Sequence, residues 1–180
     1  MSLAPVREAL AVLEQEGQLT YKPRRGYFVT ELDLDDLCEI YDLRRLVEGR
    51  AARGALPQLD ADARERIELA AEDCEAAVKR GDVTAELEAN RRFHFALLEA
   101  PDQVHTMRVV RLLWDSTETY RALYYNDPAD RVDSLEAHAR IIDAVKVGDA
   151  DALVAELDAH RAAALDRLSE FLSAEGRVEG

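Results

Sequence analysis

Cysteine is almost missing from this sequence, which has two in 180 residues. Cys38 and Cys74 form no CxxC pair and belong to no Cys-dense pattern. This usage argues against a disulfide-stabilised secreted scaffold. We therefore expect two reduced thiols in the core, with a disulfide between them as the minor alternative.

Long apolar runs are missing as well. No stretch approaches the ~20 uncharged apolar residues that a membrane span needs, and no short apolar run follows a basic start as in a signal peptide. We expect a soluble, cytoplasmic protein with no membrane partner. At 48% hydrophobic residues the chain can still bury a full core, and its length predicts one domain, or one domain plus a fragment.

Positive charge is scarce, with 23 Lys and Arg against 37 Asp and Glu and a net charge of -14. Phosphate contacts require clustered bases, so the bulk of the molecule is not expected to bind nucleic acid. Residues 1–31, however, hold four bases and four acids, so the remainder carries the whole negative charge. This asymmetry predicts two modules, residues 1–31 and 32–175, followed by a tail at 176–180.

The first module has the pattern of one helix and one β-hairpin. Residues 5–16 have apolar positions at helical spacing, and Gly17 follows as a stop. Residues 19–21 and 27–30 are β-rich, and the connection between them carries three bases at its tip. A lone helix and a two-stranded ribbon cannot form a stable core, so this module needs a neighbour or further residues before it.

From Asp33 onward the pattern is helical almost throughout. Capping acids and Gly or Pro stops divide this part into predicted helices at about 33–55, 60–80, 84–100, 104–125, 131–147 and 150–173. Short links between helices favour antiparallel neighbours. We therefore predict an all-α fold, an antiparallel bundle of about six helices, after the partial N-terminal module.

Three of the four histidines lie on apolar stripes of three different predicted helices. These are His94, His138 and His160, whereas His105 stands at a helix start and is expected to be a surface or capping residue. Burying three unpaired imidazoles costs several kcal/mol, because each neutral ring has a donor and an acceptor that need partners. A shared divalent cation removes that cost. The alternative is three separately satisfied core histidines.

The ligand types limit which metal ions are expected. Imidazole suits Zn, Ni, Cu or Fe, and three histidines leave open positions for water or a carboxylate. Asn90 lies one turn before His94, and its amide oxygen is a weak, neutral ligand. It is expected either to ligate weakly or to hydrogen-bond a metal-bound water.

Several motifs together resemble GntR-family transcription regulators of the FadR subfamily. In the first module they are PVREAL at 5–10 and PRRGYFV at 23–29. In the second they are EIYDLR at 39–44 with Val47-Glu48, the pattern Asn90-x-x-Phe93-His94, a segment at 136–149 that contains His138, and finally His160. The second set is similar to the metal-binding signature of that subfamily's C-terminal effector domain, the FCD type. The likeness covers essentially the whole chain.

The resemblance implies a site and an effector. It makes His94, His138 and His160 ligands of a divalent transition metal, zinc first and nickel as the alternative, with Asn90 where the family usually has Asp. It also implies a small carboxylic acid effector held near the metal.

A basic residue is then expected to hold that acid. Arg44 is the first choice, and Arg121 and Tyr120 are weaker ones. Surface salt bridges and core aromatics are the alternative interpretation of these residues.

The resemblance further implies a dimer that docks on operator DNA. Arg7 and the wing residues Lys22, Arg24 and Arg25 are then the DNA-contacting residues. In the family, helices precede PVREAL, so we expect a truncated winged helix-turn-helix here, with Met1-Ser2-Leu3 as a vector scar or the start of the truncation. Because the recognition helix must lie intact in the major groove, such a chain should bind operator weakly or not at all.

Two other functions also fit a three-His bundle. A metal-dependent enzyme is one, because three histidines and an open metal position also describe a hydrolytic or oxygenase centre. The sequence offers no evident general base beside the site, which weakens this reading. A helical adaptor protein whose histidines pack without metal is the other.

Overall fold

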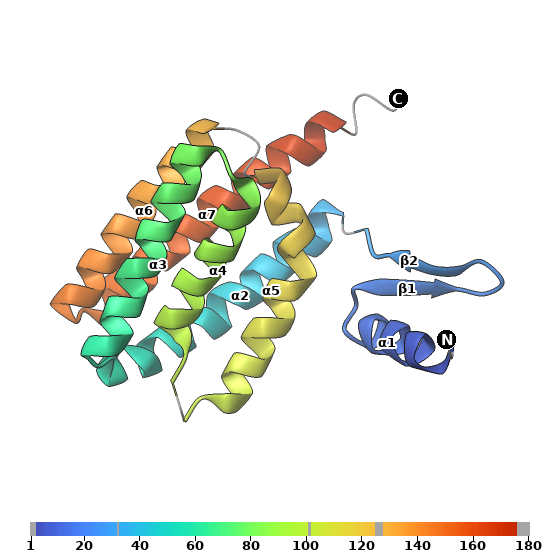
Figure 1. Ribbon diagram of the computed structural model, residues 1–180, viewed down its shortest axis with the longest axis horizontal. Helices are drawn as coiled ribbons and strands as arrows, with labels where there is room; N and C mark the ends of the chain where they lie inside the picture. The colour runs from blue at the N-terminus through green and yellow to red at the C-terminus, as the bar shows by residue number, and fades with distance from the viewer. Residues whose placement is uncertain (1–2, 32, 101, 125–127, 176–180) are drawn as a thin grey trace.

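The computed structural model describes residues 3–31, 33–100, 102–124 and 128–175 (Figure 1). The N-terminal part consists of α1 (Ala4–Gln15), β1 (Leu19–Lys22) and β2 (Gly26–Val29). Six further α-helices follow: α2 (Leu34–Ala55), α3 (Ala61–Arg80), α4 (Val83–Leu98), α5 (Val104–Tyr124), α6 (Pro128–Val147) and α7 (Ala150–Glu175), with a short 3₁₀ helix η1 (Leu56–Gln58) after α2. The predicted all-α bundle with a preceding helix and hairpin is thus confirmed.

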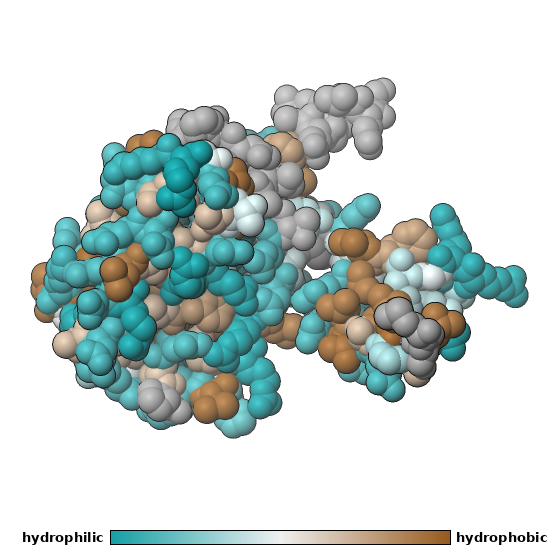
Figure 2. Space-filling view, viewed as in Figure 1, coloured by the Kyte–Doolittle hydropathy of each residue, from teal (hydrophilic) through white to brown (hydrophobic). Residues whose placement is uncertain are grey.

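The N-terminal part is a small open unit. β1 and β2 pair antiparallel from Leu19–Val29 to Lys22–Gly26. Arg24 and Gly26 take positive φ values of 65° and 94° in the turn, which closes a short hairpin. α1 buries no side chain, and apolar residues such as Val6 and Val29 lie open at the surface (Figure 2).

The helix boundaries follow from capping chemistry. The side chain of Asp33 accepts from the backbone of Asp36 and that of Asp36 from the backbone of Asp33, which is a complete capping box ahead of α2. Asp60 and Asp82 cap α3 and α4 with one hydrogen bond each, which the side chain accepts from a backbone N–H in the first turn. Gly81 ends α3 in the left-handed conformation with φ of 70°.

Three predicted boundaries were wrong by more than one residue: the start of α6, the end of α4, and the end of α7, which reaches Glu175 rather than 173. α6 begins at Pro128 rather than 131, because proline lacks only an N–H that the first helical turn leaves unused. α4 ends at Leu98 rather than 100, and Glu99 is extended. The predicted end of α5 at residue 125 lies outside the described residues.

One core joins the six bundle helices. Its largest fully buried side chains include Trp114 of α5, Phe93 of α4, Ile141 of α6 and Leu153 of α7. α7 packs against α2, α5 and α6, while α3 lies against α4 and α6 on the outside (Figure 1). Side chains from α2, α4, α5, α6 and α7 therefore meet inside the bundle.

Both cysteines are free thiols, Cys74 buried and Cys38 partly buried, as expected. Among the described residues, no helix has the length and apolar character that crossing a membrane demands.

Candidate metal and effector site

Three histidines from three helices meet inside the bundle. Each of His94 on α4, His138 on α6 and His160 on α7 offers a ring nitrogen, and these atoms all lie within 4.8 Å of one another. The ring centroids are 5.1 to 5.5 Å apart. His94 and His138 are buried, and His160 is partly buried. The structure therefore brings the three predicted ligands together.

Several polar atoms of this cluster lack a hydrogen-bond partner. Among the described residues, His94 Nδ1, both ring nitrogens of His138 and Oδ1 of Asn90 are buried without one. Such atoms are costly in an apolar interior, because each has lost its bond to water. A cation that accepts ring-nitrogen lone pairs offsets this cost, so the residues present fit a divalent transition metal.

The electrostatics keep the histidines in the form that coordinates. Burial lowers the pKa of His94 and of His138 well below the usual value, and the neighbouring histidines and Arg121 add to this. Burial, with Arg121 and Arg161 next, lowers the pKa of His160 to about 4. Only neutral imidazole has a lone pair to give, so all three rings are ready for a metal at neutral pH.

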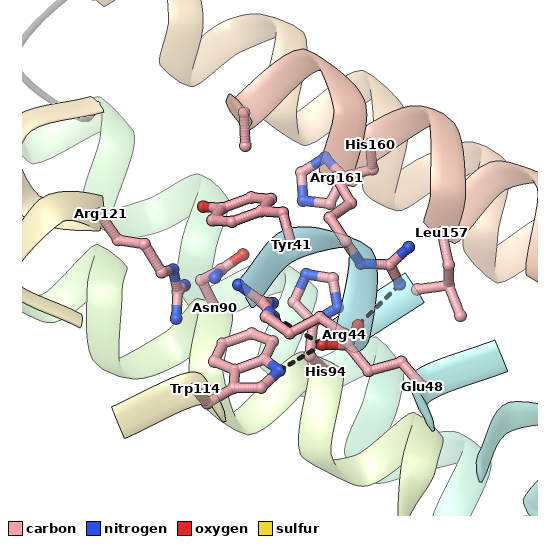
Figure 3. Close-up of a pocket in the computed structure, with 11 residues that line it drawn as sticks. Tyr41, Arg44, Glu48, Asn90, His94, Trp114, Arg121, Leu157, His160 and Arg161 are labelled. Atoms are coloured by element: carbon pink, nitrogen blue, oxygen red, sulfur yellow. Dashed lines mark hydrogen bonds and ion pairs between the residues drawn. The ribbon is translucent and has the colours of Figure 1, made fainter. Parts of the chain in front are cut away.

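A small cavity adjoins His94 and His160 between α2, α4, α5 and α7 (Figure 3). About 30 Å³ of it is open to the centre of a water molecule, which is room for about two waters. The residues that line it are Tyr41, Arg44, Glu48, Asn90, His94, Trp114, Arg121, Leu157, His160, Arg161 and Ala164.

Glu48 is the centre of a buried hydrogen-bond network in this cavity (Figure 3). Arg44 Nε and Trp114 Nε1 each donate to Oε1 at 2.7 Å, and Arg161 donates to Oε2 at 2.8 Å. Burial raises the pKa of Glu48, but Arg44 and Arg161 outweigh it and lower the pKa to about 2. Glu48 is therefore an ionised anchor for two arginines and a poor general base.

The cavity wall carries excess positive charge. Arg121 stacks on the ring of Trp114 at 4.1 Å and Arg44 does so at 4.4 Å. Three arginines, including Arg161, line the cavity against the single carboxylate of Glu48. Asp158, which does not line the cavity, pairs with Arg161 at 2.6 Å, so the lining itself presents three guanidinium groups and one carboxylate. An anion is the ligand that this wall favours.

The other predicted effector residues are only partly gathered here. Arg44 and Arg121 line the cavity, whereas Tyr120 is not among its lining residues and packs near Tyr41 and Leu168. His105 is exposed on α5, as expected.

Sequence reasoning missed the roles of Arg161 and Trp114. Glu48 belongs to the motif at the start of the second module, and its spacing of four from Arg44 is a usable sequence signal for an ion pair. Nothing in the sequence links Glu48 to Arg161, because 113 residues separate them.

The predicted DNA-contacting residues lie outside this site. Arg7 is on α1, and Lys22, Arg24 and Arg25 surround the hairpin turn, all of them exposed. Lys22 and Arg25 lie over the ring of Phe28, at 5.0 and 5.6 Å from its centroid. These four cations are thus exposed on the N-terminal part of the chain.

Comparison with known proteins identifies the family. The FCD domain matches residues 39–163, which include the three histidines, Arg44, Glu48 and Arg121. The "Probable D-xylose utilization operon transcriptional repressor" of Paenarthrobacter nicotinovorans is 30% identical over 165 residues, which cover 91% of this chain and 72% of the relative. The chain belongs to the GntR family of transcription regulators with an FCD domain.

Further matches agree with this FCD regulator family. The "Uncharacterized HTH-type transcriptional regulator YdhC" of Bacillus subtilis (strain 168) is 28% identical over 161 residues, 89% of this chain and 72% of the relative. The solved structure of E. coli McbR/YncC has the same fold, with a TM-score of 0.84 at 23% identity over 97% of this chain and 82% of that one. These relatives are transcription regulators rather than enzymes.

Proposed function

We propose that this FCD regulator senses a small carboxylic acid through a divalent metal held by His94, His138 and His160. Zinc is the first choice and nickel the alternative, because imidazole ligands suit both. The observation that carries the proposal is a buried cluster of three histidines with unpartnered nitrogens, beside a cavity with an excess of arginine. Asn90 is proposed to ligate weakly or to bond a metal-bound water.

The bound metal would supply a Lewis-acidic position for a carboxylate oxygen. The chain's own residues then select and orient the acid. Glu48 fixes Arg44 and Arg161 in place, and each guanidinium keeps further donors beyond those that Glu48 accepts. Arg121 and Arg44, stacked on Trp114, provide the positive wall that attracts an anion. Because the cavity has room for only about two waters, an acid of several carbons must displace these side chains as it binds.

Ligand binding is proposed to change DNA affinity. GntR regulators bind operator DNA and effector metabolites and usually act as dimers. In the proposed cytoplasmic dimer, Arg7, Lys22, Arg24 and Arg25 would contact phosphates on each half of a two-fold operator. An acid that favours one arrangement of the bundle would shift operator affinity, and the operator would shift acid affinity by the same factor.

Metal analysis of the purified chain tests the metal step. We expect about one zinc or nickel ion per chain, and loss of that ion in His94→Ala, His138→Ala and His160→Ala. His105→Ala is the matched control, because His105 is exposed on α5 and does not belong to the cluster. The absence of metal from the unaltered chain after loading, or equal loss in the control, would overturn the proposal.

Thermal shifts of the metal-loaded chain with a panel of organic acids test the effector step. We expect at least one small acid to raise the melting temperature, and Arg121→Ala to abolish the shift. Arg92→Ala is the control, since Arg92 makes an exposed ion pair with Asp73 and neither residue lines the cavity. If no acid stabilises the loaded chain, the carboxylate part of the proposal is wrong.

A further inference from the structure

We propose that the metal ion and the organic acid reach the three histidines from different sides, the cation through an acidic groove between α3 and α6 that ends at His138. This inference rests on the proposed metal site and names the route to it. The groove is separate from the arginine-lined cavity, and no residue lines both.

The groove is large and open compared with the cavity. About 510 Å³ of it is open to the centre of a water molecule. α3 contributes Glu68, Glu72 and Glu75 to its walls, and α6 contributes Glu136 and Lys146. A hydrated cation fits in this space, whereas the 30 Å³ of the cavity has no room for one with its water shell.

His138 connects the groove with the cluster. It lines the groove, and its ring lies 5.5 Å from that of His94 and 5.1 Å from that of His160 between centroids. It is only 2% exposed, and neither ring nitrogen has a hydrogen-bond partner among the described residues. Because it belongs both to the wall of the groove and to the cluster, His138 is the ligand that a cation arriving along the groove would meet first.

The charge of the groove suits a cation. Lys146 pairs with Glu68 at 3.0 Å, and Lys79 pairs with Glu75 at 2.6 Å. Glu72 and Glu136 are exposed, and in the part of the chain that the structure describes neither has an ion-pair partner. With the two pairs neutral, Glu72 and Glu136 leave the groove with net negative charge, which raises the local concentration and the association rate of a cation.

The cavity has the opposite sign. Arg44, Arg121 and Arg161 around it would repel a divalent cation and attract an acid. The metal is thus delivered through the groove and the acid through the cavity, and neither ligand has to pass the other. The acid would then complete the coordination of a metal ion that had entered through the groove.

Stopped-flow measurement of Co²⁺ and Zn²⁺ association with the metal-free chain tests the route. In Glu72→Gln/Glu136→Gln we expect the association rate to fall about five- to tenfold at low ionic strength, and this difference to shrink at high salt. The control is Glu65→Gln/Glu88→Gln, which removes the same charge from exposed positions of α3 and α4 that do not line the groove. Its rate should stay within twofold of the unaltered chain.

A bulky substitution in the groove distinguishes the entry route of the metal ion from its equilibrium affinity. Ala139 is exposed and lines the groove beside His138, so Ala139→Trp should slow metal association and dissociation by a similar factor and leave the equilibrium affinity unchanged. Equal rates in the two charge variants, or unaltered rates in Ala139→Trp, would overturn the route while equilibrium binding still supports the metal site. No equilibrium binding by the unaltered chain would overturn both.

Discussion

Replacing Glu48 by glutamine should destabilise this FCD domain strongly. The substitution keeps the shape of the side chain and removes the charge that Arg44 and Arg161 share. All three side chains are at most 6% exposed, so the two guanidinium groups stay buried with their countercharge gone. Removing one partner of a buried ion pair costs about 3 to 5 kcal/mol.

The lowered pKa of Glu48 gives a second value for the stability that this charge contributes. Its fall from 4.5 to about 2, at 1.36 kcal/mol per unit, corresponds to about 3 kcal/mol of stability at neutral pH. Because the pKa is lower in the folded state, this contribution is fully present above pH 4.5 and is lost as the pH falls toward 2. It should drop to less than half by about pH 3.

Urea unfolding of the unaltered chain and of Glu48→Gln at pH 7 and pH 3 measures both effects. We expect a difference of about 3 kcal/mol at pH 7, which corresponds to a lower melting temperature by about 6 to 12 °C. Asp73→Asn is the control, since its pair with Arg92 is more than half exposed and should contribute under about 1 kcal/mol. A difference below about 1 kcal/mol at pH 7, or one that is the same at pH 3, would refute the reasoning.

Three further outcomes are expected. Asn90→Asp should raise metal affinity about tenfold or more in a competition titration, because a charged carboxylate is a better ligand than an amide, and an unchanged affinity would mean that residue 90 does not face the metal. The metal-free chain should lose thermal stability as the pH falls from 6.5 toward 5. The pKa of His160 is lowered to about 4 in the folded chain, so in this range the ring takes up a proton only when the chain unfolds. A melting temperature that does not change with pH in calorimetry would contradict this. Gly54→Ala should lower the free energy of unfolding by about 1 to 3 kcal/mol in chemical unfolding. The added Cβ would lie 2.6 Å from Nε2 of Gln103, which donates to the carbonyl of Ala51. A loss under about 0.5 kcal/mol would show that Gln103 moves aside freely.

Local chemistry explains why much of the fold could be predicted. Capping acids such as Asp33 and Asp60, and the glycine stop at Gly81, act within one helical turn, so they mark helix ends in the sequence itself. The start of α6 was misplaced because Pro128 suits both a stop and a first turn, and only the path of the chain distinguishes the two.

The candidate site could be predicted only in part. The inward stripe of each helix depends on a period of 3.6 residues, so His94, His138 and His160 could each be assigned to a buried face. Their distance from one another could not, because it depends on how α4, α6 and α7 cross. Tyr120 is a second example. It is next to Arg121 in the sequence, but it lies on another face of α5 and does not line the cavity.

The sequence by itself determined the helices, their buried faces, the resemblance to FCD regulators and the candidate ligands. These depend on contacts between residues near one another in the chain and on motifs that can be read in order. Only the tertiary structure decided that Glu48 of α2 bonds Arg161 of α7, and that His138 lines an acidic groove while His94 and His160 line a separate cavity with three arginines. Those contacts join residues many helical turns apart, and their energies depend on burial, which exists only once the bundle has packed.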